Sequence, residues 1–195
     1  ETLDQIAMVQ PRVYRLIAAE LASRLLQRNS LIRPPNARPR VFFISSSESL
    51  AVMKAIRHGL KNTDADSLLW SDEDMFPPGS YPLEVLEQEV DLADFGVAIA
   101  HPDDIVRSRR NESAAPRDNV IFELGFFMSR LGRKRTFLLV PQINADLKLP
   151  SDFKGVTPIV YPPLTGKTGE IAGRVLNAPI YELEQKIQQL GCREL

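Results

Sequence analysis

Apolar residues follow a helical period in the first part of this chain. Residues 12–28 carry apolar side chains at helical spacing, with charged side chains mostly elsewhere, which predicts an amphipathic helix. Pro11 suits its first position, because a helix start leaves that backbone N–H unpaired in any case. The segment 30–39 is rich in proline and therefore predicts a linker rather than a helix. We place a domain boundary at this linker.

Beyond the linker, short apolar runs alternate with helical patterns. The runs predict strands at residues 40–45, 67–70, 95–100, 136–140 and 157–161. The segments between and after them predict helices at 48–60, in the stretch that ends at residue 90, at 119–131 and at 168–190, the last interrupted near 177–179. Asn119 is expected to cap the helix that follows it.

This alternation predicts the fold class. Strands separated by helices form a parallel sheet with helices on both faces. Right-handed crossovers then give an α/β, flavodoxin-like fold whose five-stranded parallel sheet has the order 2-1-3-4-5. Ligands of such sheets bind beyond the carboxyl ends of the strands, near the switch point between strands one and three. The loops at that point are residues 45–48 and 101–118, so we expect a ligand site between them.

Composition narrows the class of protein. At 195 residues the chain can form one domain with an appendage, and its net charge of −1 gives no overall basic field for nucleic acid. The single cysteine, Cys192, rules out a disulfide within this chain and argues against a zinc site. No apolar run approaches the ~20 residues that span a bilayer, and no signal peptide is visible. We therefore expect a cytoplasmic protein without a membrane partner. Because the chain opens with Glu1, we also expect it to be a fragment of a longer protein.

The most informative candidate for chemistry is Glu123. A polar turn at residues 117–119 leads straight into an apolar helix, where Glu123 is surrounded by Ile121, Phe122 and Leu124. A carboxylate buried without a partner costs several kcal/mol or takes up a proton. Glu123 is therefore either a surface glutamate stabilised by the helix dipole, or a carboxylate at a cleft that binds sugar hydroxyls or stabilises a cationic transition state.

Two further segments carry polar groups or a stiff turn. Ser45, Ser46 and Ser47 follow the first strand and either offer hydroxyls and amides to a phosphate or cap the next helix. Trp70 ends the second strand, and the Pro-Pro-Gly loop at residues 76–80 follows it. That loop is either a simple connection or a lid and interaction surface.

The loop after the third strand is charged. Asp103 and Asp104 either start a solvated loop or bind a ribose or a metal, and we expect no metal because the sequence shows no second cluster of acids or histidines. Arg107, Arg109 and Arg110 form a basic run in the same loop. Solvated charge is the simpler interpretation of that run, and contact with an anionic substrate or another subunit is the alternative.

With these residues identified, the segment 39–161 resembles a Toll/interleukin-1-receptor (TIR) domain. The resemblance is strongest to the TIR-like class of bacterial nucleotide-sensing defence effectors. It is carried by the strings PRVFFISSS, SDEDMFPPGSY, DLADFGVAIAHPDD and, above all, PRDNVIFELGFFMSRLGRKRTF.

The resemblance implies an NAD+ glycohydrolase with Glu123 as its catalytic residue. It implies that the loop from Phe43 to Ser47 contacts the dinucleotide and that the loop at residues 72–80 mediates head-to-tail assembly and gates the site. Further positions shape the pocket or brace the glutamate. The substrate-binding residues that we expect are Phe43, Ser45, Ser46, Ser47, Trp70, Asp103, Asp104, Arg117, Asp118 and Asn119.

The N-terminal helix carries a second, shorter resemblance. The string QPRVYRLIAAELASRLLQRN is similar to the helix that closes cyclic-nucleotide-binding domains of the catabolite-activator type, where it pairs subunits. It implies that residues 1–29 end such a domain, that 30–39 form a linker and that 40–195 form the TIR-like domain of a cyclic-nucleotide-gated (Pycsar-type) protein. The alternative is an amphipathic helix that packs on its own domain.

Together the two resemblances imply an antiviral effector that cleaves NAD+ to nicotinamide and ADP-ribose or a cyclised form. NAD+ is then the substrate, so no cofactor is expected. Self-association would use the Phe76–Tyr81 loop and the N-terminal helix, and a cyclic nucleotide would act through a sensor domain outside this chain. Two alternatives stay open: a non-catalytic TIR-type scaffold, and a relative that processes nucleosides instead of NAD+.

Overall fold

The computed structural model describes residues 11–31, 33–72, 75, 79–108, 111–143, 147–153, 155–164, 166–167 and 169–194. The expectations for Arg109, Arg110 and residues 76–78 therefore lie outside the described residues. The chain divides into two compact units, one of residues Glu1–Pro35 with Glu194–Leu195 and the other of residues Asn36–Arg193. Each unit is described by itself.

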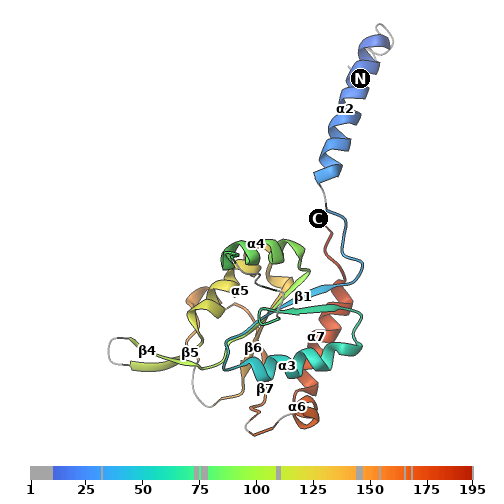
Figure 1. Ribbon diagram of the computed structural model, residues 1–195. Coiled ribbons are helices and arrows are strands. Elements are labelled where there is room, and N and C mark those ends of the chain that lie inside the picture. Colours follow the sequence, from blue (N-terminus) through green and yellow to red (C-terminus); the bar gives the residue numbers. More distant parts are fainter. Residues whose placement is uncertain are drawn as a thin grey trace. The chain divides into compact units, whose positions relative to one another are not determined.

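The first unit contains the predicted N-terminal helix. Helix α2 spans Pro11–Leu31, so it continues past residue 28 into the expected linker (Figure 1). Its exposed Arg24 donates to Glu20 one turn earlier, at 2.8 Å. Most of its large apolar side chains are exposed: Val13, Tyr14, Leu16, Ile17, Leu21, Leu25 and Leu26. The assignment of residues 1–29 to a cyclic-nucleotide-binding domain stays a prediction.

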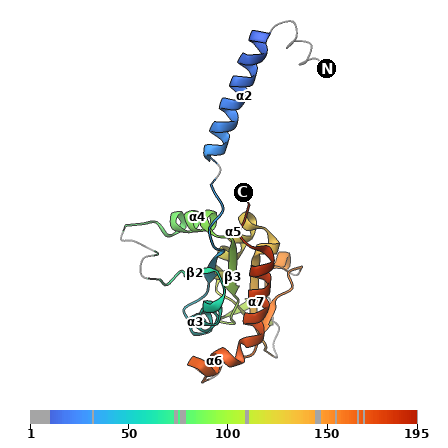
Figure 2. The same ribbon diagram turned by 90° about the vertical axis from the view of Figure 1, so that its right-hand side faces the viewer.

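The second unit is built on the predicted parallel sheet. Its strands lie in the order β2 (Asp66–Leu69), β1 (Arg40–Ile44), β3 (Phe95–Ile99), β6 (Thr136–Pro141) and β7 (Ile159–Tyr161). All neighbouring pairs in this sheet are parallel (Figures 1 and 2). The predicted order 2-1-3-4-5 is confirmed when the strands of this sheet alone are counted.

Helices cover both faces of the sheet, as predicted. The first face packs against α3 (Leu50–Gly59) with its 3₁₀ extension (Leu60–Asn62) and against α7 (Asn177–Leu190). The short helix α6 (Gly169–Val175) contacts α3 and α7. The other face packs against α4 (Pro82–Leu92) and α5 (Asp118–Leu131). Short 3₁₀ turns lie at Arg133–Arg135 and Ser151–Phe153. None of the described helices is long and apolar enough to cross a membrane.

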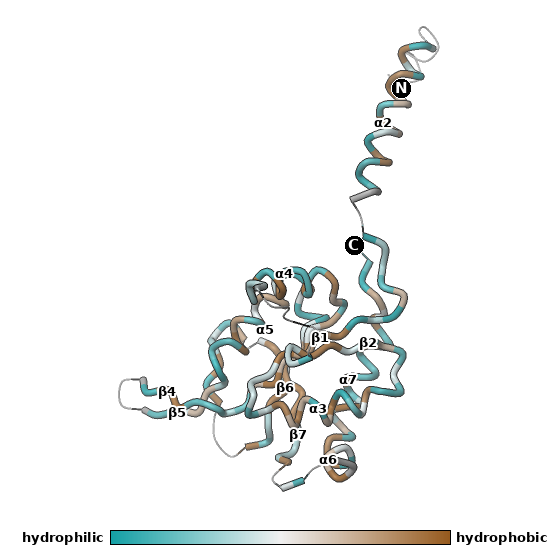
Figure 3. The backbone as a smooth tube through the Cα atoms, viewed as in Figure 1, coloured by the Kyte–Doolittle hydropathy of each residue, from teal (hydrophilic) through white to brown (hydrophobic). Residues whose placement is uncertain are grey.

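Side chains alternate between the two layers of the core. Along β1, Val41 and Phe43 belong to the cluster under α3 and α7, whereas Phe42 and Ile44 belong to the cluster under α4 and α5. Figure 3 shows the resulting apolar strands in brown at the centre of the unit. This double burial explains why the strands read as continuous apolar runs in the sequence.

A glycine brings helix α5 close to the sheet. A Cβ on Gly96 of β3 would lie only 3.0 Å from the ring of Phe127 and 3.2 Å from its Cβ. Phe127 stacks on Phe42 with ring centroids 4.8 Å apart. The missing side chain at Gly96 therefore lets α5, which carries Glu123, pack directly on β3 and β1.

A buried carboxylate joins the two ends of the second unit. Asp94, which is 1% exposed, accepts hydrogen bonds from the Asn36 side chain at 2.7 Å and from the backbone N–H of Arg40 at 2.8 Å. The backbone N–H of Arg193 donates to its other oxygen at 2.6 Å. These bonds offset the cost of burying the charge.

Two expectations about the segment before α5 are wrong. Residues 101–118 are not a loop throughout, because β4 (Asp104–Ser108) and β5 (Asn111–Ala115) form an antiparallel pair. Neither strand has an apolar run, and the pair is held by cross-strand contacts such as Arg107 to Glu112 at 2.6 Å. Asn119 does not cap α5, because the cap position belongs to Arg117 and Asn119 lies in the first helical turn.

Candidate functional site

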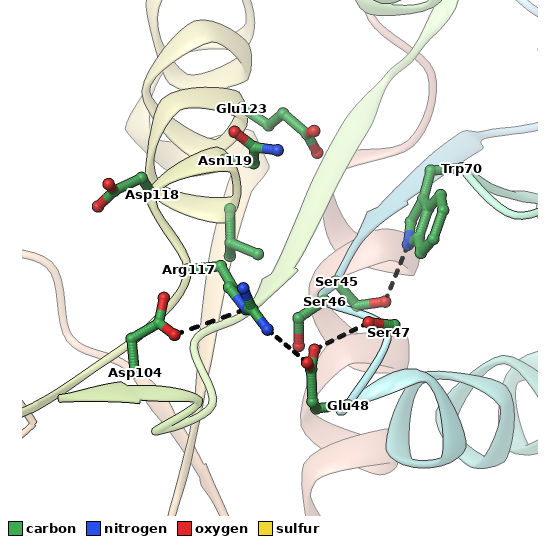
Figure 4. Close-up of a pocket in the computed structure, with 11 residues that line it drawn as sticks. Ser45, Ser46, Ser47, Glu48, Trp70, Asp104, Arg117, Asp118, Asn119 and Glu123 are labelled. Atoms are coloured by element: carbon green, nitrogen blue, oxygen red, sulfur yellow. Dashed lines mark hydrogen bonds and ion pairs between the residues drawn. The ribbon is translucent and has the colours of Figure 1, made fainter.

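A cavity of about 450 Å³ lies at the carboxyl ends of β1 and β3. Its walls come from the loop after β1, the end of β2, the start of β4 and the first two turns of α5 (Figure 4). The lining residues are Ser45, Ser46, Ser47, Glu48, Trp70, Asp104, Arg117, Asp118, Asn119, Val120 and Glu123. This is the edge at which doubly wound sheets bind their ligands.

The serine loop is held by its own hydroxyls. The Ser45 Oγ accepts a hydrogen bond from the Trp70 indole at 3.1 Å, and Ser46 Oγ lies 2.9 Å from Ser49 Oγ. The Ser49 backbone N–H also donates to Ser46 Oγ at 3.2 Å. Ser45 and Ser46 are buried, whereas Ser47 is exposed. The buried pair therefore shapes the loop and orients Trp70, and Ser47 faces solvent at the cavity.

Arg117 links the two sides of the cavity. Its Nη2 donates to Glu48 Oε1 at 2.6 Å, and its Nε lies 3.8 Å from Asp104 Oδ1 (Figure 4). The backbone hydrogen bond of Glu48 and the side-chain bonds from Arg117 and Ser47 lower the pKa of Glu48 to about 2. The hydrogen bond to Glu48 and the nearby charge of Asp104 raise the pKa of Arg117 above its ordinary value. Glu48 and Arg117 are therefore both charged at neutral pH.

Glu123 is a carboxylate of the cavity that has no partner among the described residues. Among the described residues no hydrogen bond or ion pair reaches it, and it projects with Asn119 toward the side of α5 where Trp70 lies (Figure 4). Burial raises the pKa of Glu123 to about 7. Glu123 can therefore exchange a proton near neutral pH, as a general acid or base must.

Glu123 also borders a second cavity, of about 340 Å³. Asn119 and Glu123 line both cavities, so they form the wall between them. The other residues of the second cavity are mostly apolar and come from the start of α4 and from α5: Tyr81, Pro82, Leu83, Leu86 and Phe122. A polar compartment and an apolar one thus meet at a single carboxylate.

The structure brings together all of the expected site residues except Phe43 and Asp103. Phe43 is 0% exposed and packs in the core under α3, so its side chain does not line the cavity. The Asp103 side chain is 2% exposed and pairs with His101 at 2.7 Å. Asp103 therefore anchors the segment from which the neighbouring Asp104 reaches the cavity.

Sequence reasoning missed Glu48, Val120 and the apolar compartment. Glu48 directly follows the serine cluster, which is a usable signal, but the helical spacing predicts a helix from residue 48, whereas α3 begins at Leu50. The apolar wall depends on the approach of α4 to α5, and no local pattern reveals that approach. Within the described ranges no group of three or more His, Cys, Asp or Glu residues is arranged to hold a metal ion.

Residues 40–162 match the family described as CAP12/Pycsar effector protein, TIR domain. The chain is 42% identical over 161 residues to the Pycsar effector protein BcPycTIR of Burkholderia cepacia, an alignment that covers 83% of this chain and 52% of the relative. It is 44% identical over 156 residues to PaPycTIR of Pseudomonas aeruginosa, which covers 80% of this chain and 50% of the relative.

A third relative, XpPycTIR of Xanthomonas perforans, is 44% identical over 160 residues, with 82% of this chain and 52% of the relative covered. The chain thus spans about half the length of the curated relatives that it matches. The family match covers the sheet, both cavity-lining loops and helix α5. The chain therefore belongs to the CAP12/Pycsar effector family, through its TIR domain.

Proposed function

We propose that this TIR domain cleaves the N-glycosidic bond of NAD+ and serves as the effector domain of an antiphage defence protein, with Glu123 as its catalytic residue. The observation that carries the proposal is the position of Glu123. It is an unpartnered carboxylate among the described residues, and it stands at the wall between a polar and an apolar cavity with a pKa raised to about 7. Membership of the effector family supports the same assignment.

The chemistry needs one well-placed carboxylate. When the bond between ribose C1′ and the nicotinamide ring nitrogen breaks, its electron pair neutralises the positive ring, and nicotinamide leaves without protonation. The ribose then carries oxocarbenium-like positive charge, which an ionised Glu123 stabilises. A water molecule attacks C1′ and yields ADP-ribose, and its proton passes to Glu123 or to solvent. In a cyclising reaction an adenine nitrogen would replace the water.

The two cavities suit the two kinds of group that flank this bond. The compartment lined by Tyr81, Leu86 and Phe122 fits a flat aromatic ring, whereas the serine loop, Asn119 and Trp70 offer polar contacts to a ribose. The carboxylates of the polar cavity favour the positive charge that the reaction moves from the ring to the ribose. In this proposal Phe43 and Asp103 support the site from behind rather than touch the ligand.

For the whole protein we propose activation by a cyclic nucleotide. The named relatives are Pycsar effectors, and about half of their length has no counterpart in this chain. A sensor in that part would bind the nucleotide and drive assembly through α2 and through the loop around residues 76–81. The exposed apolar side chains of α2 support the first contact, and the loop lies mostly outside the described residues.

NAD+ consumption at low and high protein concentration tests the catalytic proposal, with Glu123→Gln beside the wild type. Turnover per domain should rise with concentration, and Glu123→Gln should lower it about a hundredfold or more, because the transition-state charge loses its carboxylate. Unchanged circular dichroism would show that the variant folds. Full activity in Glu123→Gln would overturn the assignment, and no turnover at any concentration would favour the non-catalytic scaffold.

A further inference from the structure

The polar cavity carries an unusual balance of charge for a site that takes a dinucleotide. Glu48, Asp104, Asp118 and Glu123 line it as carboxylates, and among the described residues Arg117 is its one cationic lining side chain. The phosphates of a ligand would therefore pair with Arg117. Arg117, however, is already engaged by two carboxylates.

The partner that engages it most closely is Glu48. The Arg117 Nη2 lies 2.6 Å from Glu48 Oε1, whereas its Nε lies 3.8 Å from Asp104 Oδ1. Ser47 donates to the other Glu48 oxygen at 2.9 Å, which fixes the carboxylate in place. The three charges sum to a net negative cluster, so Glu48 both occupies a donor of Arg117 and repels an incoming phosphate.

The charge of the ligand decides how strongly the Glu48 carboxylate weakens its binding. NAD+ carries a positive pyridinium ring beside its two phosphates, and the acidic cavity attracts that ring. ADP-ribose keeps the phosphates and lacks the positive ring. A carboxylate that competes for Arg117 therefore weakens the binding of ADP-ribose more than that of NAD+.

We propose that Glu48 is a specificity-determining residue of this site, which holds Arg117 and thereby disfavours ligands that carry phosphate without a compensating positive charge. The proposal rests on the proposed function, because it takes NAD+ as the substrate and ADP-ribose as the product. In this proposal Glu48 promotes the release of ADP-ribose after the cleavage. Glu48 acts through Arg117, and neither the bond cleavage nor the proton transfer involves it.

Titration calorimetry of the 195-residue chain with ADP-ribose tests the proposal without any turnover. Glu48→Gln should lower the Kd of ADP-ribose about fivefold, which is the scale of one half-exposed ion pair. It should lower the Kd of NAD+ by less. The Kd of NAD+ is measured in the Glu123→Gln background, so that cleavage does not disturb the titration. Glu48→Ala serves as a second variant if the amide makes new contacts. The matched control is Asp118→Asn, which removes a carboxylate from the same cavity that forms no ion pair with Arg117 in the described part of the chain.

A double-mutant cycle separates the role of Arg117 from plain repulsion. In an Arg117→Gln background the gain from Glu48→Gln should fall below twofold. An equal gain with and without Arg117, or an equal gain from Asp118→Asn, would overturn the proposal. Weaker binding in Glu48→Gln, or no ADP-ribose binding by any variant, would also overturn it. If Glu48 controls ADP-ribose affinity but the wild type cleaves no NAD+, the proposed function fails while the role of Glu48 stands.

Discussion

At the scale of single residues, Glu123 combines a functional position with an energetic cost. Its ordinary pKa is 4.5, and burial raises it to about 7. Between these values the folded protein holds the proton more tightly than the unfolded chain does. The stability that the protonated form contributes is therefore complete below about pH 4.5 and is lost as pH rises through about 7.

This linkage predicts that Glu123→Gln stabilises the domain at alkaline pH. At pH 8 we expect its free energy of unfolding to rise by about 1–2 kcal/mol, a value reduced for the partial exposure of the side chain. At pH 4 the gain should vanish, since the wild-type carboxyl is then protonated in both states. Urea unfolding at the two pH values measures the difference, and a gain independent of pH would contradict it.

The same titration predicts the pH profile of catalysis. If the ionised form of Glu123 stabilises the transition state, kcat/KM should rise with pH through about 7 and then level off. Steady-state cleavage of NAD+ between pH 5.5 and 8.5 checks this. A rate that falls over the same range would instead assign Glu123 the role of a proton donor.

At the scale of elements, the position of α5 depends on one missing side chain. A Cβ at Gly96 would press on the Phe127 ring at 3.0 Å, so Gly96→Ala should push α5 outward and lower the free energy of unfolding by about 1–3 kcal/mol. The displacement would carry Glu123 with it and lower kcat as well. Thermal unfolding and NAD+ turnover of the same preparation measure both effects.

Gly125 provides the matched control on α5. A Cβ there meets no atom within 4 Å, so Gly125→Ala should raise the free energy of unfolding by about 0.5–1 kcal/mol through helix propensity alone. If both alanine variants were equally destabilised, the close approach at Gly96 would not be what positions the helix.

The elements also show what the sequence could reveal. Strands such as Phe95–Ile99 are buried on both faces, and that burial leaves an apolar run that is legible without a structure. The β4–β5 pair has polar strands held by each other, so its residues looked like a loop. The Arg117–Glu48 contact joins residues 69 positions apart, and only the folded sheet brings them together.

At the scale of the whole molecule, the exposed apolar side chains of α2 predict self-association. Leu21 is 55% exposed, and its burial between two copies would contribute to the free energy of dimerisation. Leu21→Glu should therefore weaken dimerisation at least tenfold. Analytical ultracentrifugation over a range of concentrations measures this. Arg24→Gln, which breaks the exposed pair with Glu20, should change the dimerisation constant less than twofold. A wild type that stays monomeric at every concentration would contradict the prediction.

The hydrogen bonds to Asp94 have a mechanical consequence. Asn36, where the second unit begins, and Arg193, where it ends, are both bonded to this one carboxylate beside the amino end of β1. The chain therefore enters and leaves the second unit at adjacent points. A force transmitted through a linker would act on the end of β1 that lies opposite the cavity. Five strand residues, roughly 16 Å of rigid backbone, separate the point of attachment from the serine loop. The segments that lead into the unit at Asn36 and out of it at Arg193 therefore lie at the end of the sheet opposite the serine loop.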